Sequence, residues 1–295
     1  MASAEAVRLP VTKTTRRPGR RLRPPVILGQ IGLWVWIACS AVPIVFMIVT
    51  SMKPQNLALA NPPVWNFAPT ASNYRDILEG RGGAPNMTPL LIHGLIITAV
   101  VTACTVAFGT LAGYALTIRS FRQRKFLSSW ILSTYMFPSI VTVVPVFFFE
   151  SHIHILGTYP GIIIPEIAFN LPIVTWLVRR GVEDIPAEVE EAGMLDGLGR
   201  LGLLRRLVLP LAVPSISAGT IVTAILVWNE FTFSLILTGS GTQPAPAAVL
   251  ELTGMYGTQW GLLSAASMLI AAPPILLALI ARRRLVTGLT FGAVK

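Results

Sequence analysis

Six stretches of the chain are apolar over the roughly 20 residues that a helix needs to cross a bilayer. Only the fourth and the fifth contain a charged residue, Glu166 and Glu230 respectively. We therefore predict an all-α membrane protein with six transmembrane helices. The predicted spans cover residues 28–51, 91–118, 126–149, 159–178, 208–237 and 262–281.

The polar stretches divide the chain further. Residues 1–27 form an arginine-rich tail, and residues 52–90 form a loop after the first span. Residues 91–284 hold the other five spans and a charged loop at residues 183–210, and residues 285–295 form a short tail. The first apolar run is far longer than the roughly 7–15 residues of a signal-peptide core, which favours a retained span.

Composition agrees with a membrane protein. The chain is 53% hydrophobic and 12% charged, whereas soluble domains average about 25% charged residues. Cys39 and Cys104 both fall within apolar runs, which indicates neither a disulfide framework nor a metal site. His152 and His154 are only a weak metal signal, so we predict no metal site and no cofactor bound by this chain.

The positive charges are distributed unevenly. Of 23 lysines and arginines, all but Lys53, Arg75 and Arg81 lie at the two ends of the chain or in the second-to-third and fourth-to-fifth loops. Cytoplasmic segments are enriched in these residues, so both termini are predicted to be cytoplasmic. Topology thus accounts for the net charge of +10, and no nucleic-acid partner is expected.

The fourth-to-fifth loop differs from the other cytoplasmic segments because acids match its bases. Anionic lipid headgroups attract basic segments but give no reason for acids, which favours a protein partner; an amphipathic hairpin without a partner is the alternative. The acids of residues 179–206 are Glu183, Asp184, Glu188, Glu190, Glu191 and Asp196.

Local signals in this loop predict two helical arms joined by a glycine turn. Pro186 suits the first turn of a helix, with Asp184 as its cap. Ala192 and Gly193 are small enough for another backbone to approach, and Gly197 suits the left-handed conformation that ends helices. The second arm is predicted from apolar residues at helical spacing, namely Leu201, Leu204, Leu207 and Val208.

The same loop resembles the EAA loop of binding-protein-dependent ABC importers. Glu191-Ala192-Gly193 stands for Glu-Ala-Ala, Asp196-Gly197 for the Asp-Gly pair and Leu209-Pro210 for the Leu-Pro pair. The third position is Gly instead of Ala. The segments "IPAEVEEAGMLDG", "WNFAPTASNY", "WNE" and "RRLVTGLTFGAVK" are similar to the carbohydrate class, in particular to its maltose-type second permease subunit. The similarity runs from about residue 28 to the C-terminus.

This resemblance implies a type I importer permease fold in the bacterial cytoplasmic membrane. The chain would form half of a translocation pathway for a sugar or related polyol. Its expected partners are an ABC ATPase dimer, a second related permease, an extracytoplasmic substrate-binding protein and membrane lipid. The coupling helix would contact the ATPase through Glu190, Glu191, Ala192, Gly193, Asp196, Gly197, Leu209 and Pro210. Independently of the resemblance, the tail at residues 285–295 is short and apolar and contains Gly288 and Gly292, so we expect it to reach toward the ATPase pair.

ATP hydrolysis is assigned to another chain. A phosphate-binding P-loop needs Gly-Lys followed by Ser or Thr, and none of the four lysines follows a glycine. ATP and Mg²⁺ are therefore expected on a separate ATPase. With no nucleophile–base pair and no metal-ligand cluster in the sequence, a membrane enzyme is the least favoured reading.

Polar residues within the predicted spans are candidates for the translocation pathway. Glu166 and Asn170 lie four residues apart, on one helix face; the alternative is a glutamate that is protonated or hydrogen-bonded to a neighbouring helix. Asn229 and Glu230 belong to the "WNE" segment in the middle of the fifth predicted span, where a structural or gating role is favoured over substrate contact.

Two questions stay open at this point. An ion-coupled secondary transporter could use Glu166 and Glu230 as proton relays, although the chain lacks the matching second half that such transporters contain. The substrate is also unassigned: a disaccharide, an oligosaccharide, a sugar alcohol and glycerol phosphate all fit the resemblance.

Overall fold

The computed structural model describes the backbone of residues 24–290 except residues 59, 61, 119–120 and 255–256. Most of the predicted N-terminal tail, residues 1–23, and the last five residues of the predicted C-terminal tail lie outside the described residues. The chain forms two compact units, Met1–Phe46 and Met47–Lys295. The first contains most of α1 (Pro24–Ser51), an apolar helix with Pro43 inside it.

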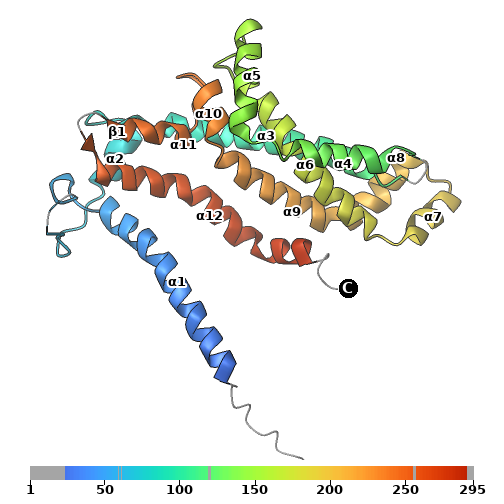
Figure 1. Cartoon of the computed structure of the whole chain (residues 1–295), viewed down its shortest axis with the longest axis horizontal. Helices are drawn as coiled ribbons and strands as arrows, with labels where there is room; N and C mark the ends of the chain where they lie inside the picture. Colours follow the sequence, from blue (N-terminus) through green and yellow to red (C-terminus); the bar gives the residue numbers. More distant parts are fainter. Residues whose placement is uncertain (1–23, 59, 61, 119–120, 255–256, 291–295) are drawn as a thin grey trace, which may run out of the picture. The chain divides into compact units, whose positions relative to one another are not determined.

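The second unit contains all the other elements (Figure 1). Its long helices are α3 (Met87–Ala115), α6 (Tyr159–Glu183), α9 (Leu209–Trp228) and α12 (Trp260–Thr290). The short strands β1 (Thr253–Gly254) and β2 (Gly257–Thr258) pair antiparallel. The shorter helices are η1 (Gln55–Leu57), α2 (Ser72–Glu79), α4 (Arg124–Thr134), α5 (Ser139–His152), α7 (Ala187–Leu195), α8 (Arg200–Leu203), η2 (Leu204–Val208), α10 (Thr232–Leu237), α11 (Ala245–Ala248) and η3 (Val249–Leu252).

The prediction of an all-α membrane protein is confirmed, but the spans differ in detail. Five described helical segments are long and apolar enough to cross a bilayer. The fifth predicted span, residues 208–237, was placed too late: the continuous helical segment runs from Arg200 to Trp228. The last helix continues to Thr290, so it includes the first residues of the predicted C-terminal tail.

The third predicted span, residues 126–149, is not one straight helix. It consists of α4 and α5, which are bent by 89° at the break between them. Pro138 is the N-cap of α5, and a residue preceding a proline disfavours the helical conformation. Pro145 lies inside α5 without ending it. Six spans are therefore present only if this bent pair counts as one.

Close contact between α3 and α6 forms the centre of the second unit. A Cβ atom at Gly109 would lie 2.7 Å from Cγ1 of Val174, and one at Gly113 would lie 3.0 Å from the backbone nitrogen of Arg179. Both distances are too short for a larger residue. The glycine pair therefore allows the two helices to approach, as small residues four apart commonly do in membranes.

A buried apolar cluster continues from this contact to the start of α9. Tyr114 of α3 and Val178 and Val182 of α6 pack with Leu204 and Val208 of η2. All five side chains are at most 6% exposed. The cluster fixes the end of α6 to the beginning of the next span, and the charged loop lies between these two points.

At the opposite end of the second unit, the "WNFAPTASNY" segment packs against the last residue of α1 and the residues that follow it. The Asn73 side chain donates hydrogen bonds to the carbonyls of Ser51 (2.9 Å) and Lys53 (2.7 Å). The ammonium of Lys53 lies 5.3 Å from the ring of Trp65 and 5.5 Å from that of Phe67. Lys53 is only 3% exposed, so cation–π contacts replace part of its lost hydration.

Candidate functional site

The charged loop folds into two helical arms joined by a turn, which we call the elbow (residues 186–210). The first arm is α7. The second comprises α8 and η2 and continues into α9. Glu188 and Glu190 lie in the first turn of α7, where carboxylates interact favourably with the helix dipole. The predicted arrangement of helix, turn and helix is confirmed.

The start of the first arm differs from the prediction. Pro186 is the N-cap of α7 and precedes its first turn. Asp184 does not cap α7: it is the C-cap of α6, where its N–H donates to the carbonyl of Arg180. Because the residue before a proline disfavours helical geometry, Ile185 separates the two helices.

The turn of the elbow depends on Gly197, as predicted. Its φ is +80°, in the left-handed region. The N–H of Gly197 donates to the carbonyl of Met194, and the N–H of Leu198 donates to that of Gly193, both at 3.0 Å. These two bonds form a Schellman motif, which satisfies carbonyls that a helix end otherwise leaves unpaired.

Gly193 holds the two arms together. A Cβ atom at this position would lie 2.6 Å from Cδ1 of Leu207 and 2.7 Å from Cδ2 of Leu203. The sequence predicted that another backbone approaches here, but the close neighbours are side chains of the chain's own second arm. The small residue therefore shapes the elbow itself.

The Leu209-Pro210 pair marks the change from the second arm to the membrane helix. Pro210 has no N–H to donate to the carbonyl of Arg206 and would crowd that carbonyl in a regular α-helix. The preceding turn, η2, is a π-helix, in which the N–H of Leu209 donates to the carbonyl of Leu204. The wider turn thus accommodates the proline without ending the helix.

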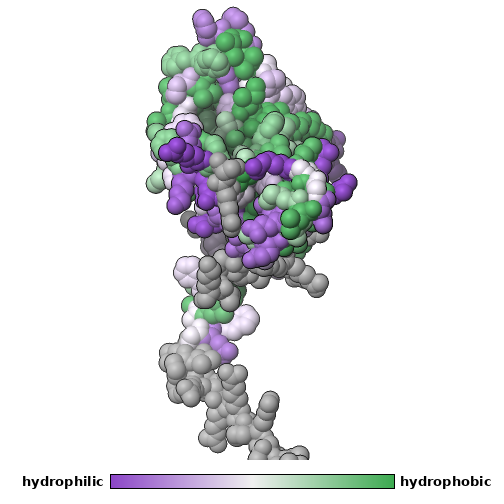
Figure 2. Space-filling view, turned by 90° about the vertical axis from the view of Figure 1, so that its right-hand side faces the viewer, coloured by the Kyte–Doolittle hydropathy of each residue, from purple (hydrophilic) through white to green (hydrophobic). Residues whose placement is uncertain are grey.

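The free face of the elbow combines acids with exposed apolar side chains. Leu195 is 89% exposed, Leu201 58% and Met194 54%. Glu191, Ala192 and Asp196 are also exposed. Figure 2, which faces the end that carries α7 and α8, shows hydrophilic side chains gathered there. Large apolar side chains exposed on such a loop are typical of a protein-binding surface.

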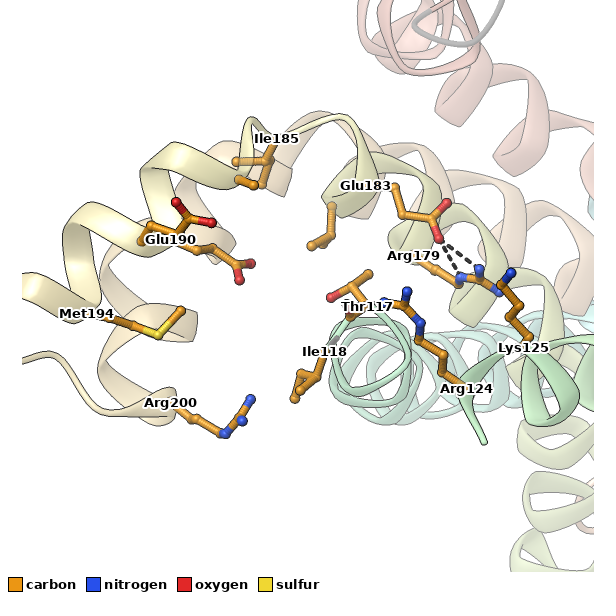
Figure 3. A pocket seen from close by; sticks show the side chains of 13 residues that line it. Thr117, Ile118, Arg124, Lys125, Arg179, Glu183, Ile185, Glu190, Met194 and Arg200 are labelled. Atoms are coloured by element: carbon orange, nitrogen blue, oxygen red, sulfur yellow. Dashed lines mark hydrogen bonds and ion pairs between the residues drawn. The ribbon is translucent and has the colours of Figure 1, made fainter. Parts of the chain in front are cut away.

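A charged cavity of about 390 Å³ lies beside the elbow (Figure 3). Arg124, Lys125 and Arg179 lie on one side of it, and Glu190 and Met194 lie on the other. The guanidinium of Arg179 binds Glu183 of the same helix at 2.8 Å and also contacts the hydroxyl of Ser128 in α4. Glu183 itself also lines the cavity, and the remaining lining residues are Thr117, Ile118, Val182, Ile185, Ala187, Glu191 and Arg200.

Glu166 and Asn170 share one face of α6, as predicted, and bind each other. The amide of Asn170 donates to the Glu166 carboxylate at 3.0 Å and to the Glu166 backbone carbonyl at 2.9 Å. Their exposed fractions are 1% and 3%. Although Pro165 and Pro172 lie within it, α6 is continuous. The pair is therefore buried within this chain in the observed conformation.

Asn229 and Glu230 do not lie in the middle of a span. Asn229 is the C-cap of α9, and its amide donates to the carbonyl of Ile225 at 2.7 Å. The carboxylate of Glu230 accepts a hydrogen bond of 2.7 Å from the N–H of Phe233, in the first turn of α10. Asn229 thus ends α9, and Glu230 stabilises the start of α10. Hydropathy does not reveal this break because the residues on both sides of it are apolar.

Trp228, the first residue of "WNE", connects two spans. Its indole N–H donates to the carbonyl of Ile270 in α12 at 2.9 Å. In a regular helix this carbonyl would accept from residue 274, but Pro274 has no N–H. The indole therefore satisfies a carbonyl that the proline leaves free. The sequence signal for this contact is a proline four residues after Ile270.

Comparison with known proteins agrees with this geometry. Residues 105–290 match the family described as "Binding-protein-dependent transport system inner membrane component". The chain is 30% identical to the trehalose/maltose transport system permease protein MalG of Thermococcus litoralis, over 91% of this chain and 96% of that protein. It is 31% identical to the trehalose transport system permease protein SugB of Mycobacterium tuberculosis, over 88% and 94%.

A solved structure shares the fold. A chain of a bacterial ABC transporter involved in import of the acidic polysaccharide alginate superposes with a TM-score of 0.75 at 20% identity. The match covers 91% of this chain and 99% of that chain. The elbow lies within the residues that match the family, and so do both polar pairs of the spans.

Proposed function

This chain belongs to the family of binding-protein-dependent transport system inner membrane components, and from that membership we propose the role of each of its sites. It is a multi-pass permease subunit of an ABC importer. We propose that it forms half of a pathway for a sugar or related polyol, beside a second, related permease. An extracytoplasmic binding protein delivers the substrate, and the chain itself catalyses no reaction.

The observation that carries the proposed coupling is the elbow. Its turn is fixed by Gly197 and its arms by Gly193, so Leu195 and the neighbouring acids are presented on a preorganised surface. Such a surface fits a cleft in a cytoplasmic ATPase dimer, which would bind ATP and Mg²⁺. Motion of the ATPase would reach the spans through η2, which joins the elbow to α9 without a break.

The energy source tests this function against the ion-coupled alternative. We expect uptake into membrane vesicles to stop when ATP is removed while the proton gradient is kept. An ABC importer requires nucleotide hydrolysis for each transport cycle, whereas a proton relay through Glu166 and Glu230 requires only the gradient. Uptake that persists without ATP and stops with an uncoupler would assign the chain to the alternative.

The orientation of the chain is a second proposal. We place both termini in the cytoplasm of a bacterial cell, and residues 54–89 outside. With this orientation, all lysines and arginines except Lys53, Arg75 and Arg81 lie in cytoplasmic segments, where these residues are enriched. A single cysteine at the exposed Trp65 should react with an impermeant thiol reagent in intact cells. A cysteine at Arg16 should react only after lysis; the reverse pattern would overturn the orientation.

A carbohydrate substrate is supported by the named relatives. The protein of T. litoralis is a trehalose/maltose permease and that of M. tuberculosis is a trehalose permease. Neither name settles which sugar this chain carries. Titrating the binding protein encoded beside this chain with disaccharides, oligosaccharides and polyols would identify the class.

A role of Glu166 and Asn170 in the pathway is a further proposal, supported by a carboxylate and an amide together on a membrane helix. Glu166→Gln keeps the size of the side chain and can still accept the Asn170 hydrogen bond. We expect a change in the KM for uptake by about tenfold, with normal assembly. The control is Glu150→Gln, which alters the buried carboxylate of α5. Unchanged kinetics with lower membrane abundance would show a packing role instead.

A further inference from the structure

The charged cavity beside the elbow contains cations that no carboxylate neutralises among the described residues. Arg124 donates one hydrogen bond, to the carbonyl of Thr117 at 3.1 Å, and Lys125 makes no hydrogen bond or ion pair within the described chain. Both belong to the first turn of α4 and line the cavity. The ion pair of Arg179 with Glu183 leaves these two charges unchanged.

The opposite wall of the cavity carries Glu190, Glu191 and Arg200, two acids and one base, so its net charge is negative. Figure 3 shows Glu190 of α7 across the opening from Arg124 and Lys125. A ligand that bridges these walls needs an anionic group at one end and a cationic group at the other. The volume of about 390 Å³ is within the range of roughly 300–1,000 Å³ that is typical of small-ligand sites.

The cavity lies where a membrane helix meets its charged loop. Directly after Arg124 and Lys125, α4 exposes Phe126 (71%) and Trp130 (58%). On α6, Trp176 is 36% exposed and lies 5.9 Å from the guanidinium of Arg180. Exposed tryptophans next to basic residues mark the level of lipid headgroups. The cavity therefore lies at the depth of the lipid headgroups.

We propose that this cavity binds the headgroup of a membrane phospholipid that carries an amine. The phosphate contacts Arg124 and Lys125, the ammonium contacts Glu190, and the acyl chains extend from the cavity into the bilayer. Basic pockets at the cytoplasmic ends of membrane helices suit phosphate groups. A lipid in this position connects the first arm of the elbow to α4. The assignment to the cytoplasmic leaflet rests on the proposed orientation.

Lipid binding can be measured on the purified full chain, without an ATPase, so its failure and the failure of coupling are distinguishable. The delipidated chain is titrated with phosphatidylethanolamine and phosphatidylglycerol and observed by native mass spectrometry. We expect Arg124→Gln/Lys125→Gln to weaken binding of phosphatidylethanolamine by about tenfold or more. The control with the same charge change is Arg205→Gln/Arg206→Gln, whose side chains are exposed outside the cavity, and it should bind as the wild type does.

The role of Glu190 is tested by the preference of the chain for phosphatidylethanolamine over phosphatidylglycerol. The wild type should prefer phosphatidylethanolamine, and Glu190→Gln should lose this preference, whereas Glu188→Gln, which does not line the cavity, should retain it. Equal lipid binding by Arg124→Gln/Lys125→Gln and by Arg205→Gln/Arg206→Gln would overturn the proposal. So would soluble phosphoethanolamine that binds as tightly as the lipid, because the cavity would then serve a soluble ligand. If Arg124→Gln/Lys125→Gln loses the ATPase on purification but still binds the lipid, the cavity would be assigned to a protein partner.

Discussion

Gly197→Val is expected to reduce ATP-driven uptake by at least about tenfold while the permease still inserts in the membrane. At φ +80° an L-residue costs on the order of 1–2 kcal/mol, and a β-branched residue costs more. The turn would have to adopt another conformation, which breaks the two Schellman bonds at Met194 and Gly193. Each 1.4 kcal/mol of this cost reduces the equilibrium constant for forming the elbow about tenfold. Uptake and ATPase co-purification should therefore fall by at least that factor.

The chain offers a matched control two residues later. Gly199 lies in the same turn with a φ of −72° and ψ of 170°, an extended conformation that valine readily adopts. A Cβ atom has no neighbour within 4 Å at either glycine, so crowding is equal in both. Gly199→Val should transport as the wild type does. Equal loss in both variants would show that bulk, and not the left-handed turn, is decisive.

Leu195→Asp should separate the permease from its ATPase. The side chain is 89% exposed in the isolated chain, so the change costs little in folding. Burying a leucine at an interface is worth about 1.5–3 kcal/mol, and a carboxylate would oppose that burial. The affinity for the ATPase should fall at least tenfold, measured by co-purification from detergent. Leu250→Asp, at a 49% exposed leucine in η3, is the control; normal ATPase retention by Leu195→Asp would contradict docking at this residue.

The elbow could be predicted from the sequence because its determinants are local. A proline, acids in the first turn and a glycine at the helix end act within a few residues of one another. What approaches Gly193 could not be predicted, because that depends on where the second arm folds back. A small residue indicates a close contact but not its partner.

The membrane segments show the same limit. Hydropathy located the apolar stretches, but it cannot show that Pro138 produces an 89° bend while Pro145 and Pro172 are accommodated within helices. Whether a proline breaks a helix depends on which groups satisfy the freed carbonyls. Trp228 does so for Ile270, over 42 residues of sequence. The break after Trp228 was likewise hidden within apolar sequence.

Cross-linking at Leu195 tests the central claim most directly. The native Cys39 and Cys104 are first replaced by serine, a cysteine is introduced at Leu195, and a second at Leu250 in a separate variant. A benzophenone that carries a maleimide is then attached to the introduced cysteine in membranes that contain the intact importer, and irradiation inserts the benzophenone into a C–H bond of the protein that lies beside it. The account predicts a covalent product between the permease and its ATPase from position 195 and none from position 250. Absence of the product at 195, in membranes where the ATPase still co-purifies with the permease, would contradict the claim that the elbow is the coupling element.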